Sequence, residues 1–224
     1  MKLKQLVLFA MSASLVFGAN DAVKRLQASA TTISEIMGAS DKSIPQDLLD
    51  KADCVVIVPG LKKGAFIIGG KFGRGFATCR KEAAGWSAPA AMRVEGGSFG
   101  FQIGGSETDV IMLVMNKSGM DKLFTSKFTL GADASVAAGP VGRTSSAETD
   151  ALMRAEILTY SRSRGVFAGI ALNGATLRPD DDTNRDLYGS ALTTKEIVMG
   201  NTAPPAAASA LLADLNKYSS RRSK

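Results

Sequence analysis

CVVIVPGLKKGAFIIGGKFGRG, residues 54–75, is the stretch that decides the fold. Its first five residues, Cys54 to Val58, are continuously apolar and mostly β-branched, as in a strand buried on both faces. Pro59-Gly60 predicts a turn at the end of that strand. The glycines that follow recur at the spacing of hairpin turns. The stretch therefore predicts a β-sheet at the centre of the protein.

Further strand-like runs continue on the C-terminal side. Their close spacing favours antiparallel pairing. Between Gly64 and Met115 the predicted strands are GAFIIGG, FGRGFATCR, WSAPAAMRVEG, SFGFQIGG and TDVIMLVM. Strand character resumes in KFTLGADASVAAG, AEILTYSRS and GVFAGIALNG.

Helices are predicted on both sides of these strands. From Asp21 to Met37 apolar residues recur at steps of three and four, and Gly38 is a natural stop. Shorter helices are expected in PQDLLDKA, SGMDKLFTS, TNRDLYG and TTKEIVMG, and a last one from about Pro205 to Tyr218. The sequence thus predicts one α+β domain, a glycine-rich antiparallel sheet or partly closed barrel with flanking N- and C-terminal helices.

The first residues have the layout of a secretory signal peptide. Lys2 and Lys4 precede an apolar stretch from Leu6 to Val16, and small residues follow at Gly18 and Ala19. An uncleaved anchor is the alternative, but the apolar stretch is short beside the roughly 20 residues of a span. We expect a signal peptide at 1–19, a domain at 20–204, and a C-terminal helix and basic tail at 205–224. We expect the mature protein to be periplasmic, either free there or peripheral to a membrane.

Composition argues against most enzymes. The 224 residues contain no His, which excludes Ser-His-Asp and Cys-His catalysis and the commonest transition-metal ligand. GGSFG at 96–100 fits the G-x-S-x-G pattern, but a strand is expected after Ser98 where a nucleophile elbow needs a helix. We expect no catalysis and no cofactor. The formal charge of +6 is too modest, in an exported protein, to predict a nucleic-acid partner.

Two smaller patterns leave alternatives open. In an oxidising compartment Cys54 and Cys79 can form a disulfide, or they can be two separately buried thiols. Asp180, Asp182, Asn184 and Asp186 alternate like the first ligands of a calcium loop. Arg185 replaces the glycine of such a loop, so a solvated helix N-terminus is the other interpretation.

Positive charge is concentrated in the first half of the chain. Residues 51–93 carry eight cations against Asp53 and Glu82. If the cations converge on one face they would bind an anionic lipid surface, whereas scattered cations would only protect sheet edges from aggregation. The lipid-binding candidates are Lys62, Lys63, Lys71, Arg74, Arg80, Lys81, Arg162 and Arg164.

Long ordered segments resemble the SYLF domain family, in a match that runs through about residues 22–200. They are residues 54–75, 85–116, 127–143 and 160–189. The resemblance implies a lipid-binding module: eukaryotic members recognise phosphoinositides, and fungal ones also bind actin, which we do not expect of an exported chain. It also implies a membrane role for basic residues and an amphipathic N-terminal helix, here the helix from Asp21 to Met37 with Lys24 and Arg25. The other hypothesis is a structural or partner-binding envelope protein without a lipid ligand.

Overall fold

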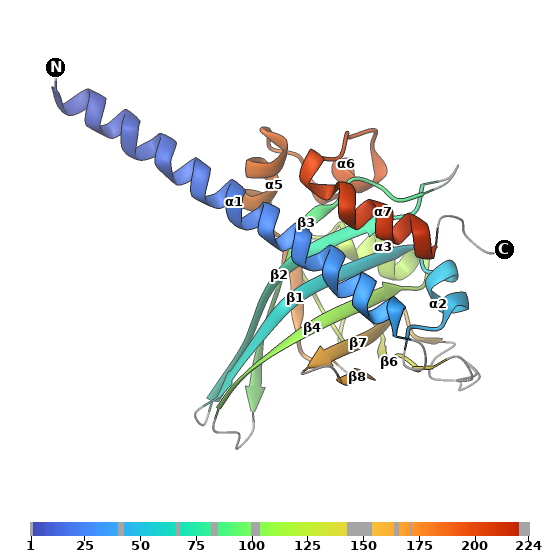
Figure 1. Ribbon diagram of the computed structural model, residues 1–224. Helices are drawn as coiled ribbons and strands as arrows, with labels where there is room; N and C mark the ends of the chain where they lie inside the picture. Colours follow the sequence, from blue (N-terminus) through green and yellow to red (C-terminus); the bar gives the residue numbers. More distant parts are fainter. Residues whose placement is uncertain are drawn as a thin grey trace.

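The protein, seen in a computed structural model, folds as helices around one curled sheet (Figure 1). The structure describes residues 2–39, 43–65, 68–81, 85–99, 104–142, 154–163, 166–170 and 172–219, with backbone alone at 2–19, 64–65, 68–69, 98–99, 104–106 and 167. The helices are α1 (Lys2–Gly38), α2 (Gln46–Lys51), α3 (Lys117–Leu123), α5 (Asp181–Tyr188), α6 (Thr194–Met199), the 3-10 turn η1 (Ala206–Ala208) and α7 (Ser209–Tyr218). The strands are β1 (Cys54–Ala65), β2 (Ile68–Cys79), β3 (Ala90–Phe99), β4 (Gly104–Val114), β5 (Phe128–Thr129), β6 (Val136–Ala138), β7 (Ile157–Ser163), β8 (Val166–Gly169) and β9 (Thr176–Pro179).

The strands form one mixed sheet that curls into a half-barrel. In the described part of the chain the order is β5-β9-β3-β2-β1-β4-β7-β6, with β8 also on β7. The α+β prediction is confirmed, including the flanking terminal helices. Pairing is antiparallel except between β6 and β7, which run parallel. This differs from the all-antiparallel expectation because the long connection from Ala138 to Ile157 lets the chain re-enter the sheet in the same direction.

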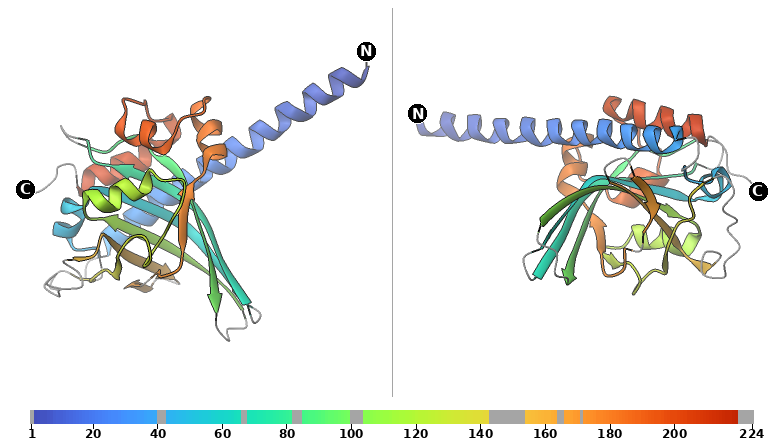
Figure 2. Two further views of the ribbon diagram at one scale, coloured as in Figure 1. Left: turned by 180° about the vertical axis from the view of Figure 1, so that it is seen from behind. Right: turned by 60° about the horizontal axis from the view of Figure 1, so that its bottom comes forward.

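Strand β1 is buried on both faces, as predicted from Cys54 to Val58. Val55 and Ile57 contact the apolar cluster under α1 and α7, whereas Cys54, Val56 and Val58 contact the cluster inside the half-barrel. Helices α1 and α7 lie side by side on one face of the sheet, and α3 lies on the other (Figure 2). We call these the helix face and the concave face.

The predicted turn at Pro59-Gly60 is wrong. Strand β1 continues through both residues to Ala65, and the register against β2 and β4 shifts there by one residue. Gly60 has a φ of 61°, which glycine adopts without steric cost. The pair forms a β-bulge, which a proline tolerates because the ladder is interrupted at that point.

Two of the predicted strands are in fact connections between strands; β1 and β2 are paired neighbours, whereas β3 and β4 lie apart in the sheet. GAFIIGG spans the passage from β1 to β2, and SFGFQIGG spans the passage from β3 to β4; residues 66–67 and 100–103 lie outside the described part of the chain. The start of WSAPAAMRVEG is not strand either, because β3 begins at Ala90. The errors at GAFIIGG and SFGFQIGG arose from glycine pairs, which lie at the ends of long strands. These strands extend past the helices as a twisted arm (Figure 1).

The predicted helices are present, with one extension. Helix α1 contains Asp21 to Met37 and ends at Gly38, but it starts at Lys2 and projects beyond the rest of the protein (Figure 1). Helix α6 begins with a capping box in which Thr193 and Glu196 satisfy each other's backbone amides. None of the helices in the described part of the chain is long and apolar enough to cross a membrane.

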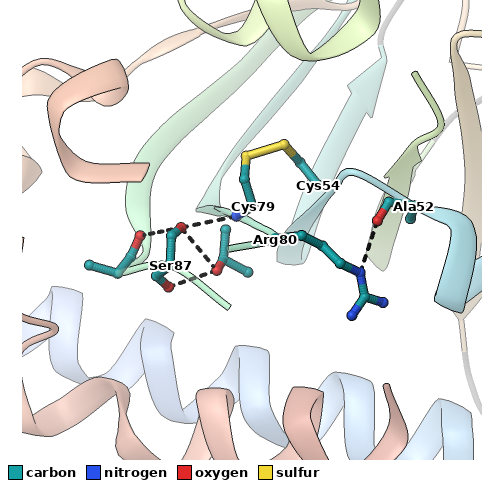
Figure 3. The surroundings of a disulfide bond; sticks show 7 residues. Ala52, Cys54, Cys79, Arg80 and Ser87 are labelled. Atoms are coloured by element: carbon teal, nitrogen blue, oxygen red, sulfur yellow. Dashed lines mark hydrogen bonds between the residues drawn. A yellow bond between two sulfur atoms is a disulfide. The ribbon is translucent and has the colours of Figure 1, made fainter. Parts of the chain in front are cut away.

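The two cysteines form a disulfide, which is the first of the two alternatives that the sequence left open. Cys54 and Cys79 are register partners on β1 and β2, with Cα atoms 3.9 Å apart (Figure 3). Beside them, the backbone N–H of Cys79 donates to the Ser87 hydroxyl at 3.0 Å, and the Thr78 hydroxyl donates to the Ser87 carbonyl at 2.8 Å. The bond therefore joins the two central strands at the end of the sheet opposite the arm.

Candidate functional site

A groove of about 910 Å³ lies on the helix face, between the middle of α1 and the bulge of β1. Its size suits a small ligand or a headgroup. The lining is polar, with side chains from α1, β1, β4 and β7. It comprises Asp21, Lys24, Arg25, Ala28, Pro59, Gly60, Lys62, Glu107, Asp109 and Arg162.

The floor of the groove is a fixed ion-pair network around Arg162. Its guanidinium donates twice to one carboxylate oxygen of Asp109, from Nε at 3.1 Å and from Nη2 at 2.7 Å, and its Nη1 pairs with Glu35 of α1. The other Asp109 oxygen accepts the backbone N–H of Gly60 at 2.9 Å. The bulge, β4, β7 and α1 are thus tied together under the groove.

The rim carries charges of both signs without ion pairs. Asp21, Lys24, Lys62 and Glu107 form no salt bridge within 4 Å in the part of the chain that the structure describes. Lys62 and Glu107 are register partners on β1 and β4, so their side chains leave the sheet side by side on the helix face. A side chain at Gly60 would put its Cβ 2.5 Å from a Glu107 carboxylate oxygen. The missing side chain therefore leaves the Glu107 carboxylate room above the bulge.

A cluster of arginines adjoins the groove, around one buried carboxylate. Asp180 is inaccessible to solvent and pairs with Arg93 at 2.6 Å and with Arg74 at 3.4 Å. Burial opposes ionisation of Asp180, but hydrogen bonds from Arg93 and Thr183 and the charge of Arg74 outweigh it and lower its pKa. Burial lowers the pKa of Arg25 on α1, and the nearby Arg74 adds to this effect.

The structure separates the predicted lipid-binding cations between the two faces of the sheet. Lys62 and Arg74 are on the helix face, since Lys62 pairs in register with Phe72 two residues before Arg74. Lys63 and Lys71 are register partners on the concave face. Burial lowers the pKa of Lys63, and the charge of Lys71 lowers it further. These four cations therefore do not form one patch.

The Arg80 side chain binds backbone carbonyl groups at the end of the sheet that carries the disulfide. Its guanidinium donates to the carbonyl oxygens of Ala52, Leu49 and Ser219 and stacks on Trp86. Lys81 beside it is exposed. Arg162 is in the floor of the groove, and Arg164 lies outside the described residues.

The acidic run at the start of α5 builds a helix terminus. Asp180 caps α5 by accepting from the Thr183 amide, and the buried Asn184 accepts the Ala91 amide at 2.7 Å. Asp182 is exposed and pairs with Arg93, and Asp186 is half-buried on the same helix. Within the described ranges no group of three or more Cys, Asp or Glu side chains is placed to hold a metal ion. Asp180 and Asn184 therefore serve the cap and the sheet contact of α5, and the calcium interpretation stays a prediction.

The serine of the GGSFG pattern lies within a strand. Ser98 is the second-last residue of β3, so a strand and not a strand-to-helix turn presents it. Its side chain is outside the described part of the structure.

Comparison with known proteins gives the chain a family. Residues 95–218 match the family described as Ysc84, "Las17-binding protein actin regulator". The chain belongs to the Ysc84, or SYLF, family. The matched region runs from the end of β3 through α7, so this Ysc84 domain includes the C-terminal helix that packs against α1.

Relatives of this Ysc84 domain are fungal and animal proteins. An SH3 domain-containing protein of Schizosaccharomyces pombe is 36% identical over 185 residues, covering 81% of this chain and 43% of that protein. LAS seventeen-binding protein 3 of Saccharomyces cerevisiae is 34% identical over 187 residues, covering 82% of this chain and 40% of its own. Human SH3 domain-containing YSC84-like protein 1 is 32% identical over 183 residues, covering 81% and 53%. The chain thus spans about half the length of the curated relatives it matches, and the name of the second of them describes a binding protein.

Sequence reasoning missed most of the groove of this Ysc84 domain. It named Lys62 and Arg162, and it assigned Lys24 and Arg25 to a membrane helix, but it missed Asp21, Glu107 and Asp109. Asp21 is at the start of the predicted N-terminal helix and Asp109 is in the predicted strand TDVIMLVM, and no local pattern linked these carboxylates to the cations. Strand alternation in TDVIMLVM places Asp109 on one face with Ile111, which is the single signal that pointed toward the helix face.

Proposed function

We propose that this chain is a non-catalytic domain that binds anionic phospholipid headgroups at a membrane surface of the cell envelope. The observation that carries the proposal is the groove, where four cations from three separate elements share a polar hollow with three carboxylates; the cations are Lys24, Arg25, Lys62 and Arg162. Arg162 is already paired with Asp109 and Glu35, which leaves the other three cations to meet a phosphate group. Arginine and lysine side chains converging from several elements are the usual way in which proteins hold a phosphate group.

Export is part of the same proposal. Export directed by residues 1–19 would place the domain in the periplasm, and their removal would make α1 begin at the edge of the groove, close to Asp21. The Cys54–Cys79 disulfide supports this compartment, since disulfides persist in oxidising environments and are rare in the cytosol.

Vesicle sedimentation tests the proposal directly. The protein without residues 1–19 should sediment with phosphatidylglycerol:phosphatidylcholine vesicles and stay in solution with pure phosphatidylcholine, with binding reduced as salt rises. Lys24→Gln combined with Lys62→Gln should weaken binding several-fold. Lys195→Gln on α6, an exposed site away from the groove, is the matched control. Equal indifference to both lipids at low salt would overturn the proposal.

A second candidate function is partner binding without a lipid ligand. The names of the relatives favour it, because the family description contains "Las17-binding" and "actin regulator". Light scattering and co-purification from the envelope would separate the two functions. A stable protein complex that excludes vesicles would support partner binding, and a monomer with saturable lipid binding would count against it.

The absence of catalysis is also a proposal. Support comes from the lack of any His in the sequence and from the binding-type names of the relatives. A hydrolytic turnover of the purified protein that is lost in Ser98→Ala would contradict it.

A further inference from the structure

The rim of the groove is more specific than a basic patch. Within the described part of the chain, the lysines Lys24 and Lys62 form no salt bridge, and neither do the carboxylates Asp21 and Glu107. Arg25 is a third such cation, but it is half-buried and lies near enough to Asp21 and Asp180 for their charges to act on its pKa. A ligand with negative charge alone would be attracted by the lysines but repelled by the carboxylates. A ligand with one charge of each sign would satisfy both.

The floor of the groove cannot supply the missing counter-charges. Asp109 is already committed to Arg162 and to the Gly60 amide, and Arg162 is also paired with Glu35. The fixed floor holds the bulge in place, and the bulge sets the position of Lys62 relative to Glu107. The backbone positions of Lys62 and Glu107 are therefore set relative to each other, while their charged groups remain available to a ligand.

The kind of positive group follows from the lining. Quaternary ammonium groups such as choline are recognised by aromatic faces, and the described lining of the groove contains no aromatic side chain. A primary ammonium group has three N–H donors, which suit carboxylate acceptors such as Glu107 and Asp21.

We propose that the groove selects a headgroup that carries both a phosphate and a primary ammonium group, as phosphatidylethanolamine does. The phosphate lies against Lys24 and Lys62, and the ammonium group lies against Glu107 with Asp21 beside it. The proposal rests on the proposed lipid-binding function and adds the identity of the headgroup.

Vesicles of equal surface charge test the selection. Phosphatidylglycerol is kept at one fixed fraction, and the remaining lipid is either phosphatidylethanolamine or phosphatidylcholine. We expect about tenfold tighter binding to the ethanolamine vesicles, the difference that a charge-assisted hydrogen bond gives. Soluble glycerophosphoethanolamine should compete and glycerophosphocholine should not, which excludes an effect of membrane packing.

Two single variants test the contacts of the ammonium group and of the phosphate group separately. Glu107→Gln should remove the preference for ethanolamine while leaving binding to choline vesicles unchanged or slightly stronger. Lys62→Gln should weaken binding to both vesicles by a similar factor, and Lys195→Gln should change neither. Thermal unfolding of each variant checks that the fold is intact.

The outcomes distinguish this inference from the function on which it rests. Equal binding to the two vesicle types, or an ethanolamine preference that survives in Glu107→Gln, would overturn the headgroup assignment alone. Failure to bind any phosphatidylglycerol vesicle, with no competition by either soluble headgroup, would overturn the lipid-binding function itself.

Discussion

Arg80 stacks on Trp86, with its guanidinium carbon 4.1 Å from the ring centroid, and both side chains donate to the carbonyl oxygen of Ser219. The Arg80 guanidinium also donates hydrogen bonds to the carbonyl oxygens of Leu49 and Ala52. In the sequence, Arg80 directly follows the disulfide-bonded Cys79. The end of α7, the end of α2 and the disulfide-linked strands are therefore joined through one side chain. This cation belongs to the stability of the fold.

Arg80→Gln should destabilise the protein by about 2–4 kcal/mol, because several buried carbonyl groups lose a charged donor together. Urea unfolding gives the magnitude, and faster proteolysis near the C-terminus should accompany it because Ser219 is released. Lys81→Gln, at the exposed neighbouring position, should shift stability by less than about 0.5 kcal/mol. Equal effects of the two substitutions would contradict this role of Arg80.

Loss of the disulfide should also lower stability. The bond closes a loop with a sequence separation of 25, for which chain entropy gives a stabilisation of about 3 kcal/mol. The double variant Cys54→Ala with Cys79→Ala should unfold at lower urea than the oxidised protein. Reductant should lower the unfolding midpoint of the wild type and leave that of the double variant unchanged; an identical response in both would disprove the contribution.

Asp180 should make stability depend on pH in the acid range. Its pKa is lower in the folded protein than the ordinary value of about 3.9, so the unfolded chain binds the proton first as pH falls. The contribution is complete above about pH 5 and is lost as pH falls through the lowered pKa. Asp180→Asn keeps a capping side chain on α5 but removes the charge, and should cost about 2–4 kcal/mol at pH 7.

Urea midpoints from pH 7 to pH 2.5 provide the measurement for Asp180. The difference between wild type and Asp180→Asn should shrink as the solution is acidified, since the other carboxylates titrate in both proteins. A difference that stays constant with pH would mean that the Asp180 charge does not contribute through its ion pairs.

Glycines of β2 should differ sharply in their tolerance of a methyl group. At Gly75 a Cβ would lie 2.0 Å from the carbonyl oxygen of Ile57, whereas at Gly70 it would meet nothing within 4 Å. Gly75→Ala should therefore cost about 3 kcal/mol or more, and Gly70→Ala should be within about 0.5 kcal/mol of wild type. Thermal unfolding of the two variants compares them directly, and a tolerated Gly75→Ala would show that β1 can move away from β2.

Local patterns predicted the fold better than the site. Two short-range signals predicted the central strand and the N-terminal helix. One was the continuous apolar run from Cys54 to Val58, and the other was the recurrence of apolar residues at steps of three and four after Asp21. Both β1 and α1 include the residues predicted for them. The ion pair between Arg93 and Asp180 joins residues 87 positions apart, so no local pattern could reveal it. Which face of the sheet a cation of β1 lies on depends on where the in-and-out alternation of side chains is interrupted. Pro59-Gly60 is that interruption, but the sequence pattern there predicted a turn instead of a bulge.

The bulge in β1 lets this strand lose one residue without exchanging its two faces. Before Pro59 the even-numbered residues point into the half-barrel, whereas after Gly60 the odd-numbered Leu61 does. Deleting Pro59 or Gly60 would join the two halves into one regular alternation, with Leu61 still inside the half-barrel and Lys62 still on the helix face. Deleting Leu61 with the bulge retained would instead carry Lys62 into the apolar interior and remove it from the groove. A codon lost at the bulge should therefore be tolerated better than a codon lost just after it.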